Sequence, residues 1–321
     1  MISQVAILSA QGLGDALLMR IACYHFEKAG ANVTLYHSNP EILQPLFPTG
    51  NFSPYPQINE FAKTFAKYDL ILLENDHSEK AWALMHLREK GLLPQLKVFF
   101  PTPNKKMQKP CDYLCNPTLP IATNLTLACH GLEPSIAASK DNNLLLPSHA
   151  YKNRYPTQVI LHPTSKDPKR NWKQKQFVSL AKKLTILGFA PIFSVSVEEF
   201  PLWSSIQNDG FNVVVSNSLI ELATLCYESG YFIGNDSGIG HLASNVGLPT
   251  LTISGNPKRV SLWRPDWSQN LIVTLPFNLP NFKGIHFRFR ENYWQNFIPV
   301  SKVISKFHKL IKASSQGTTW Y

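Results

Sequence analysis

The sequence predicts an α/β protein made of two domains, each with a mostly parallel β-sheet. Short apolar runs alternate with amphipathic stretches along the chain, which is typical of repeated strand–helix–strand units. The length of 321 residues fits two domains better than one. A polar, proline-containing stretch at residues 140–157 separates two such series, so we place the domains at residues 1–152 and 153–321.

The first series begins with Gln4–Ser9, a continuous apolar run that is typical of a buried parallel strand. The glycine-rich turn Gln11–Gly14 follows, and Asp15–Lys28 then has apolar residues at helical spacing. We also expect strands at Asn32–His37, Asp69–Leu73 and Lys97–Phe100, a helix at Glu79–Lys90, and a loop over residues 101–120.

The second series repeats this alternation. Its expected strands are Gln158–His162, Ala190–Val195, Tyr231–Gly234 and Thr250–Ile253. Its expected helices are Gln174–Leu187, Leu219–Glu228 with Ser218 as N-cap, Ser237–Val246 and Val300–Lys312. In open α/β sheets, ligands bind at the carboxyl ends of the strands, so a two-substrate enzyme with its cleft between two such sheets is expected.

Composition excludes several classes of protein. A hydrophobic content of 44% excludes wholesale disorder, and no apolar run reaches the ~18 residues that a membrane span needs. The start Met1–Gln4 lacks the basic region of a signal peptide, and Asp15 interrupts the apolar stretch that follows. We therefore expect a cytoplasmic protein.

The five cysteines are odd in number and irregularly spaced, which does not indicate a disulfide framework. Cys111, Cys115, Cys129 and His130 could in principle form a zinc set, but their spacing fits no standard pattern. We therefore expect no metal and no cofactor.

Positive charge is concentrated in the second half of the chain. Residues 1–150 hold 12 basic and 12 acidic side chains, whereas residues 256–321 hold 10 basic and 2 acidic ones. This excess suggests an anionic partner, and a solvated basic face is the alternative. Aromatic residues of this segment, such as Phe287 and Trp294, alternate with basic ones as in some nucleic-acid-binding proteins. Packing against the last helix explains them more simply, so we expect no nucleic-acid partner.

Three polar motifs follow expected strands. In Gly12–Asp15, the turn places Asp15 at a helix N-terminus, where the helix dipole favours an ionised carboxylate that could act as a general base; helix capping is the alternative. In Gly234–His241, glycines and free N–H groups at a helix start suit phosphate oxygens, and Ser237 and His241 share a helix face. The alternative is a glycine-rich turn with a buried histidine.

The third motif is His162–Trp172, which offers two hydroxyl groups and three cations after a strand. Hydroxyls and cations suit a diphosphate, and a solvated charged loop is the alternative. The sequence has no D-x-D carboxylate pair of the kind that holds a divalent metal in other transferases.

Together, these motifs resemble glycosyltransferase family 9, the bacterial heptosyltransferases of lipopolysaccharide assembly. Gly234–Ala243 (GNDSGIGHLA) is similar to the family's G-x-D-[ST]-G-x-x-H-L-x signature. The stretch Leu13–Asp15 is similar to its N-terminal L-G-D motif, and His162–Trp172 is similar to its phosphate loop. The three motifs occur in the family's order.

The resemblance implies a GT-B fold with an N-terminal acceptor-side and a C-terminal donor-binding Rossmann-like domain. It implies inverting, metal-independent transfer of a sugar, typically heptose from ADP-heptose, to a hydroxyl of a growing lipopolysaccharide core. The acceptor would then be an anionic glycolipid at the cytoplasmic face of the inner membrane. We expect the basic segment to bind that anionic surface peripherally.

The resemblance also implies roles for single residues. Asp15 takes the position of the base, with Gly14 and Arg20 on the acceptor side. The donor-binding positions fall on Thr164, Ser165, Lys169, Asn217, Asp236, Ser237, Gly238 and His241. Counting back from Trp172 selects Arg170 rather than Lys169 as the phosphate ligand, and either Glu198 or Glu199 matches a glutamate near the ribose. Departures around Met19–Ile21 and at Ile239-Gly240 bear on the acceptor and the sugar.

A second reading is a catalytically silent module that binds nucleotide sugars. Such a module would keep the 162–172 and 234–241 loops but would not need Asp15. Donor binding without turnover on any glycan distinguishes it from the enzyme.

Overall fold

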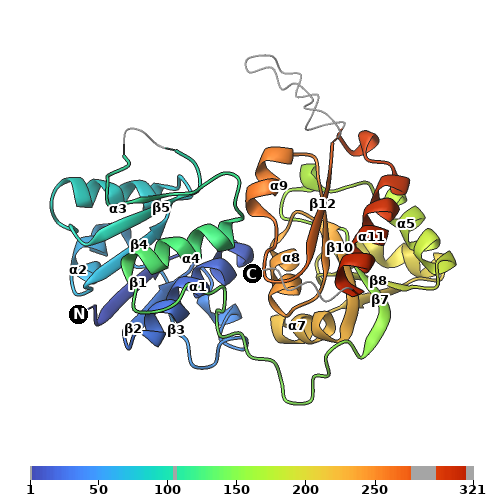
Figure 1. Ribbon diagram of the computed structural model, residues 1–321, viewed down its shortest axis with the longest axis horizontal. Helices are drawn as coiled ribbons and strands as arrows, with labels where there is room; N and C mark the ends of the chain where they lie inside the picture. The colour runs from blue at the N-terminus through green and yellow to red at the C-terminus, as the bar shows by residue number, and fades with distance from the viewer. Residues whose placement is uncertain (1, 104–106, 276–293, 316–321) are drawn as a thin grey trace, which may run out of the picture. The chain divides into compact units, whose positions relative to one another are not determined.

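The computed structural model describes residues 2–103, 107–275 and 294–315. The chain divides into two compact units, Met1–Leu145 and Leu146–Tyr321 (Figure 1). Each unit contains a six-stranded sheet in which all the pairs of neighbouring strands are parallel. The predicted α/β class with two parallel sheets is therefore confirmed.

The first unit has the strand order β3-β2-β1-β4-β5-β6. Its strands are β1 (Gln4–Leu8), β2 (Asn32–Tyr36), β3 (Asn51–Ser53), β4 (Leu70–Glu74), β5 (Leu96–Phe100) and β6 (Tyr113–Leu114). Its α-helices are α1 (Leu13–Lys28), α2 (Phe61–Phe65), α3 (Glu79–Glu89) and α4 (Ile121–Leu132). The strand order reverses between β1 and β4, which is the switch point where doubly wound sheets bind ligands.

The second unit has the order β12-β11-β10-β7-β8-β9, which is the same topology read from the other edge. Its strands are β7 (Tyr155–His162), β8 (Ala190–Val195), β9 (Asn212–Val215), β10 (Ser229–Asn235), β11 (Thr250–Ser254) and β12 (Asn270–Thr274). Its α-helices are α5 (Gln174–Ile186), α6 (Phe200–Trp203), α7 (Leu219–Glu228), α8 (Gly238–Asn245), α9 (Pro257–Trp263) and α11 (Val300–Ser315). Its switch point lies between β7 and β10.

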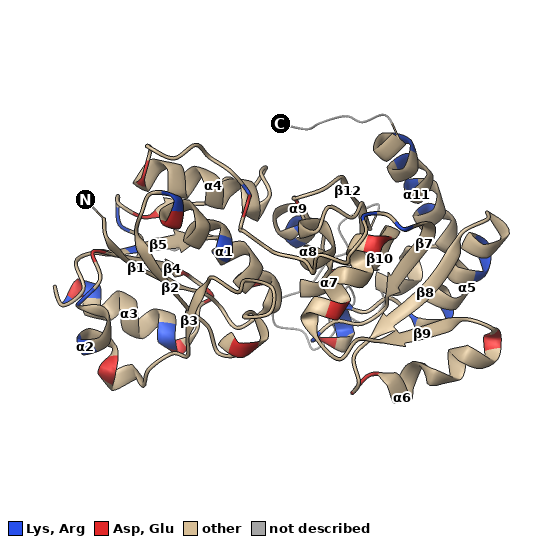
Figure 2. Cartoon of the chain, turned by 90° about the horizontal axis from the view of Figure 1, so that it is seen from below, with Lys and Arg blue, Asp and Glu red and all other residues tan. Residues whose placement is uncertain are grey.

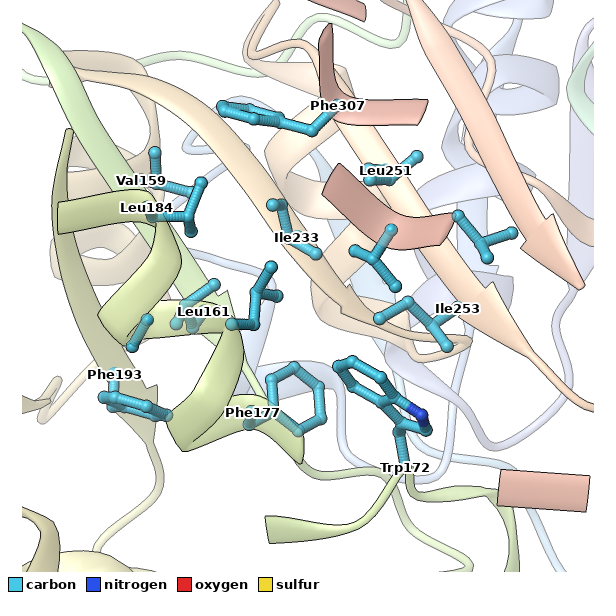
Figure 3. Close-up of a cluster of buried hydrophobic side chains, with 14 of the residues drawn as sticks. Val159, Leu161, Trp172, Phe177, Leu184, Phe193, Ile233, Leu251, Ile253 and Phe307 are labelled. Carbon is cyan, nitrogen blue, oxygen red and sulfur yellow. The ribbon is translucent and has the colours of Figure 1, made fainter. Parts of the chain in front are cut away.

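The core of the second unit forms where α5 and α11 pack on one face of the sheet. Phe177 and Leu184 of α5 contact the same cluster as Phe307 of α11, and the buried ring of Trp172 belongs to it (Figure 3). The indole N–H of Trp172 donates to the carbonyl oxygen of Ile298 at 3.0 Å. The apolar face of α11 therefore packs on the sheet of its own unit.

All the inner strands of both sheets were predicted from the sequence, with small shifts at their ends. The four edge strands, β3, β6, β9 and β12, were not, and β6 lies inside the expected loop at residues 101–120. Inner strands are buried on both faces and form continuous apolar runs, whereas these edge strands are only partly buried. Helices α2, α4, α6 and α9 were also missed.

None of the helices in the described ranges is long and apolar enough to cross a membrane. Within the same ranges, no group of three or more His, Cys, Asp or Glu side chains is placed to hold a metal ion. Among the alternating aromatic and basic residues of the segment 256–321, Phe282, Lys283, Phe287, Arg288, Phe289, Arg290 and Tyr293 lie outside the described residues.

Candidate functional site

Asp15 lies at the switch point of the first unit, in the first turn of α1 directly after β1. Its Oδ2 atom accepts the backbone N–H of Gly12 at 3.1 Å, so the carboxylate closes the turn that precedes the helix. A Cβ atom on Gly12 would collide with this oxygen, so a side chain there would displace the carboxylate from its present position. The side chain is partly exposed. Capping and base chemistry are therefore compatible in this position.

Glu74 is a second carboxyl group at this switch point, and the sequence analysis missed it. It ends β4, is only 3% exposed, and accepts the backbone N–H of Ala10 at 3.0 Å. Burial raises the pKa of Glu74 well above its ordinary value, and the nearby charge of Asp15 raises it further. The raised pKa favours the protonated, neutral form of Glu74 beside Asp15. Its place at the end of the apolar run Leu70–Glu74 was the available signal.

Gly14 and Arg20 lie on α1, and both are buried. The guanidinium of Arg20 pairs with Glu27 at 2.7 Å and lies over the ring of Phe47, 5.0 Å from its centroid. Arg20 is 1% exposed, so these contacts hold it inside the first unit. Contact between Arg20 and an acceptor stays a prediction, and the burial of the Arg20 side chain argues against it.

The loop after β7 carries Thr164 and Ser165. The Thr164 hydroxyl donates to Oε2 of Glu199 at 3.0 Å, and the same oxygen accepts the backbone N–H of Ser196. Glu199, rather than Glu198, is thus the glutamate that contacts this loop. The Ser165 hydroxyl bonds Oδ1 of Asn171 at 2.6 Å. Both hydroxyls currently hold the loop in shape.

Lys169 and Arg170 occupy different environments at the end of this loop. Lys169 is exposed, and no partner of its ammonium group is found among the described residues. Arg170 is partly buried, and its Nη2 lies 2.7 Å from Oδ2 of Asp236. The two alternatives left by the sequence therefore lie side by side, with Arg170 linking the loop to the second motif.

Asp236 follows β10 at the switch point and pairs with two guanidiniums. Besides Arg170, the Nε of Arg259 on α9 lies 3.3 Å from the same carboxylate oxygen. Asp236 does not cap α8, whose N-cap position is Ser237. Two cations therefore flank this one carboxylate, so the charge of Asp236 alone does not exclude a phosphate from the neighbourhood. Arg259 was missed in the sequence, although it follows the end of β11 as Asp15 follows β1.

Ser237, Gly238 and His241 form the start of α8. The Ser237 hydroxyl oxygen and Nδ1 of His241 are both buried and have no hydrogen-bond partner among the described residues. Burial lowers the pKa of His241 to about 4, so its ring is neutral at physiological pH. An unpaired buried polar atom costs free energy unless a ligand or water satisfies it. These two atoms are therefore available to a ligand at the helix start.

A pocket of about 340 Å³ opens in the second unit, at the carboxyl ends of β7, β10 and β11. It is lined by Asp167, Lys169, Arg170, Asp236, Ser254, Gly255, Asn256, Arg259 and Trp294. The structure thus brings Lys169, Arg170 and Asp236 into one pocket, with Ser237 next in the chain. Asn217 is exposed before α7, and its backbone N–H donates to Glu221; it is not among the lining residues that the structure describes.

Solved structures identify the class of this fold. The chain is similar to a glycosyl transferase family 9 protein from Veillonella parvula, with a TM-score of 0.66 and 16% identity over 97% of each chain. It is also similar to E. coli ADP-heptose lps heptosyltransferase II, with a TM-score of 0.64 and 14% identity over 97% of this chain and 99% of that one. E. coli heptosyltransferase WaaC with ADP gives a TM-score of 0.66 and 11% identity, covering 96% and 99%. The fold is therefore of the GT-B type.

The model of glycosyltransferase family 9 (heptosyltransferase) matches residues 118–284, and the chain belongs to this family. Among curated proteins, the chain is similar to lipopolysaccharide heptosyltransferase 3 of Escherichia coli, with 24% identity over 168 residues. That match covers 50% of this chain and 49% of the relative, so the chain spans about half the length of the curated relatives it matches. The predicted family is confirmed.

Proposed function

We propose that the protein is an inverting, metal-independent glycosyltransferase that moves a heptose from ADP-heptose to a hydroxyl group of a lipopolysaccharide core or a related glycan. The observation that carries the proposal is the cationic pocket at the carboxyl ends of the strands of the second unit, where Lys169 and Arg170 lie in one pocket with Asp236, two residues before α8. Solved relatives of the same fold include E. coli WaaC with ADP and with ADP-2-deoxy-2-fluoro heptose, which supports the choice of donor.

In the proposed reaction, Asp15 accepts the proton of the acceptor hydroxyl as its oxygen forms a bond to the anomeric carbon. The bond between that carbon and the diphosphate oxygen breaks, and its electron pair leaves with ADP. Lys169 and Arg170, with the Ser237 and Gly238 amides, would stabilise the charge on the leaving group. A fixed set of cations and N–H dipoles in a pocket can supply this stabilisation without a metal ion.

The remaining donor positions would act through hydrogen bonds. Ser237 and His241 each hold a buried, unpaired polar atom that could bind a phosphate or sugar oxygen. Thr164, Ser165 and Asn217 stay proposed donor contacts. An anionic glycolipid at the cytoplasmic face of the inner membrane would be the acceptor, and Gly14 and Arg20 stay proposed on its side.

A donor screen tests this function. Thermal unfolding is measured with ADP-, UDP- and GDP-sugars, because a ligand at about 100 times its dissociation constant stabilises a protein by about 2.7 kcal/mol. Release of the nucleotide is then followed with and without lipopolysaccharide-core acceptors. Stabilisation by ADP-heptose and acceptor-dependent ADP release support the proposal. Stabilisation without turnover on any glycan favours a silent binding module, and no response to ADP-heptose contradicts the donor.

A further inference from the structure

Arg259 is placed like a ligand-binding residue, yet neither the sequence motifs nor the roles discussed above include it. It lies on α9, directly after β11, and lines the same pocket as Arg170. Both guanidiniums contact Oδ2 of Asp236, Arg170 at 2.7 Å and Arg259 at 3.3 Å. The carboxylate is 8% exposed, whereas the two arginine side chains are 33% and 47% exposed. The carboxylate of Asp236 is therefore buried, while the two guanidiniums that it binds remain accessible.

The backbone of Arg259 is fixed by its own helix cap. The N-cap residue Asn256 accepts the backbone N–H of Arg259 at 3.1 Å through its side chain. The guanidinium also lies over the ring of Trp263, 5.7 Å from its centroid. Only Nε of the guanidinium is used by Asp236, so the two Nη groups keep their donors for another acceptor.

The charges around the pocket favour an anion with more than one charge. Its lining includes three cations, Lys169, Arg170 and Arg259, and two carboxylates, Asp167 and Asp236. Asp236 is already shared by two arginines, and Asp167 accepts the backbone N–H of Lys169 at 3.1 Å. A guanidinium presents its donors in a planar fork that matches phosphate oxygens.

We propose that Arg259 is a second diphosphate-binding guanidinium, and that Asp236 is a positioning residue which holds Arg170 and Arg259 as a pair. The inference rests on the proposed function, because it takes the donor's diphosphate as the ligand. It assigns the two arginines to one ligand group, although Arg170 lies in the loop after β7 and Arg259 on the helix after β11. Asp236 then acts through its arginines and needs no contact with the donor.

Binding of ADP, AMP and inorganic pyrophosphate to the full chain tests the role of Arg259, with calorimetry as the readout. Arg259→Gln should weaken binding of ADP and pyrophosphate by about 10- to 100-fold, the size expected for hydrogen bonds to a charged group. Its effect on AMP should be smaller. Arg259→Lys keeps the charge but loses the fork, so it should fall between wild type and Arg259→Gln. Lys258→Gln is the matched control, because it removes the same charge from the exposed neighbour on α9.

The Asp236→Asn variant distinguishes a role of Asp236 in positioning the arginines from an effect of its negative charge alone. Removing a negative charge from the pocket should tighten anion binding if only net charge matters. If Asp236 positions the arginines, Asp236→Asn weakens ADP binding, and the added effect of Arg259→Gln shrinks in the double variant.

The outcomes distinguish this inference from the proposed function. Wild-type protein that binds pyrophosphate but no ADP contradicts the donor, and loss of that pyrophosphate binding in Arg259→Gln still supports the inference. Arg259→Gln that binds ADP and pyrophosphate as Lys258→Gln does overturns it, as does wild-type protein that binds neither.

Discussion

The side-chain amide of Asn235 donates a 2.6 Å hydrogen bond to the carbonyl oxygen of Pro163. Its Oδ1 also accepts the backbone N–H of Trp172 at 3.0 Å. One buried residue at the end of β10 therefore fixes both ends of the loop that carries Lys169 and Arg170. At Gly234, an added Cβ would lie 2.9 Å from the carbonyl oxygen of His162, so the two strand ends also approach closely there.

Asn235→Ala should destabilise the second unit and weaken ADP binding together. The substitution leaves a buried carbonyl and a buried N–H without their partner, at about 1–3 kcal/mol for each group. Urea unfolding and calorimetry with ADP measure the two effects. Asn212→Ala, on the exposed end of β9, should change the free energy of unfolding by less than about 0.5 kcal/mol. Asn235→Ala with wild-type stability and affinity contradicts this account of the loop.

Asp15→Asn should lower turnover by about 10²- to 10⁴-fold, the usual size of general-base catalysis. The amide keeps the shape and can still accept the N–H of Gly12, so the turn before α1 should persist. Affinity for ADP should be unchanged, because the proposed phosphate ligands lie in the other unit. Initial rates with the true acceptor and calorimetry with ADP measure the two quantities. Near-normal turnover in this variant removes Asp15 from the role of base.

Glu74→Gln should make the protein more stable relative to wild type as pH rises. The raised pKa of Glu74 means that the folded state keeps a proton which the unfolded chain releases above about pH 4.3. The wild type therefore loses stability as pH rises from there towards the pKa of the folded state, and glutamine has no such proton to lose. Asp15 and Asp76 both contribute to the raised pKa of Glu74.

Urea unfolding of this variant and of wild type at several values between about pH 4 and about pH 7 measures the difference. Glu41→Gln, at an exposed glutamate, is the control and should show no such trend. A stability difference between Glu74→Gln and wild type that stays flat across this range contradicts the raised pKa of Glu74.

His241→Gln should reduce the loss of stability in mild acid. The pKa of His241 is about 4 in the folded protein, whereas an unfolded histidine binds a proton near pH 6.5. Wild-type stability therefore falls as pH drops from about 6.5 to about 4, by roughly 3 kcal/mol through this residue. Unfolding curves across that range measure it, with exposed His308→Gln as control. Equal acid sensitivity of wild type and His241→Gln would show that the ring is not held neutral.

The inner strands of each sheet could be predicted from the sequence, whereas the edge strands could not. Inner strands such as β1 and β10 are apolar on both faces, so their burial can be predicted from a run of consecutive apolar residues. β6 has two residues and β3 has three, too few to show a pattern, and they form only because a neighbouring strand offers its edge. Helix α1 was predicted because its long apolar periodicity repeats over 16 residues.

The same contrast applies to the candidate site. Residues inside contiguous motifs, such as Asp15 and Asp236, could be singled out from the chain alone. Arg259 and Glu74 join those motifs only through the parallel pairing of β11 and β4 with their neighbours. Asp236 lies 23 positions before Arg259, and Asp15 lies 59 positions before Glu74, so no local spacing in the sequence reveals these contacts. The rule that ligand residues follow strand ends would have selected both.

The last prediction concerns a basic groove on the second unit. Figure 2 shows Lys and Arg along α5 and α11. These helices line a groove of about 440 Å³ with Lys183, Ser301, Ile304, Ser305, His308, Lys309 and Lys312. Val303 and Phe307 of α11 are fully buried, and Lys302 donates to the carbonyl oxygen of Thr274, whereas Lys309 and Lys312 are exposed. We therefore expect peripheral binding to anionic membranes through exposed lysines, with no inserted segment.

Sedimentation with anionic and neutral liposomes at low and high salt measures this binding. Each lysine near an anionic surface contributes about 1 kcal/mol and is screened by salt, so a Lys309→Gln/Lys312→Gln double variant should bind anionic liposomes up to about 30-fold more weakly at low salt. A Lys63→Gln/Lys67→Gln variant removes the same charge from exposed positions in the first unit and should bind as wild type does. Equal pelleting with both lipids, binding that resists high salt, or an equal loss in the control variant contradicts the electrostatic account, because each outcome means that the charge of this groove does not drive the contact.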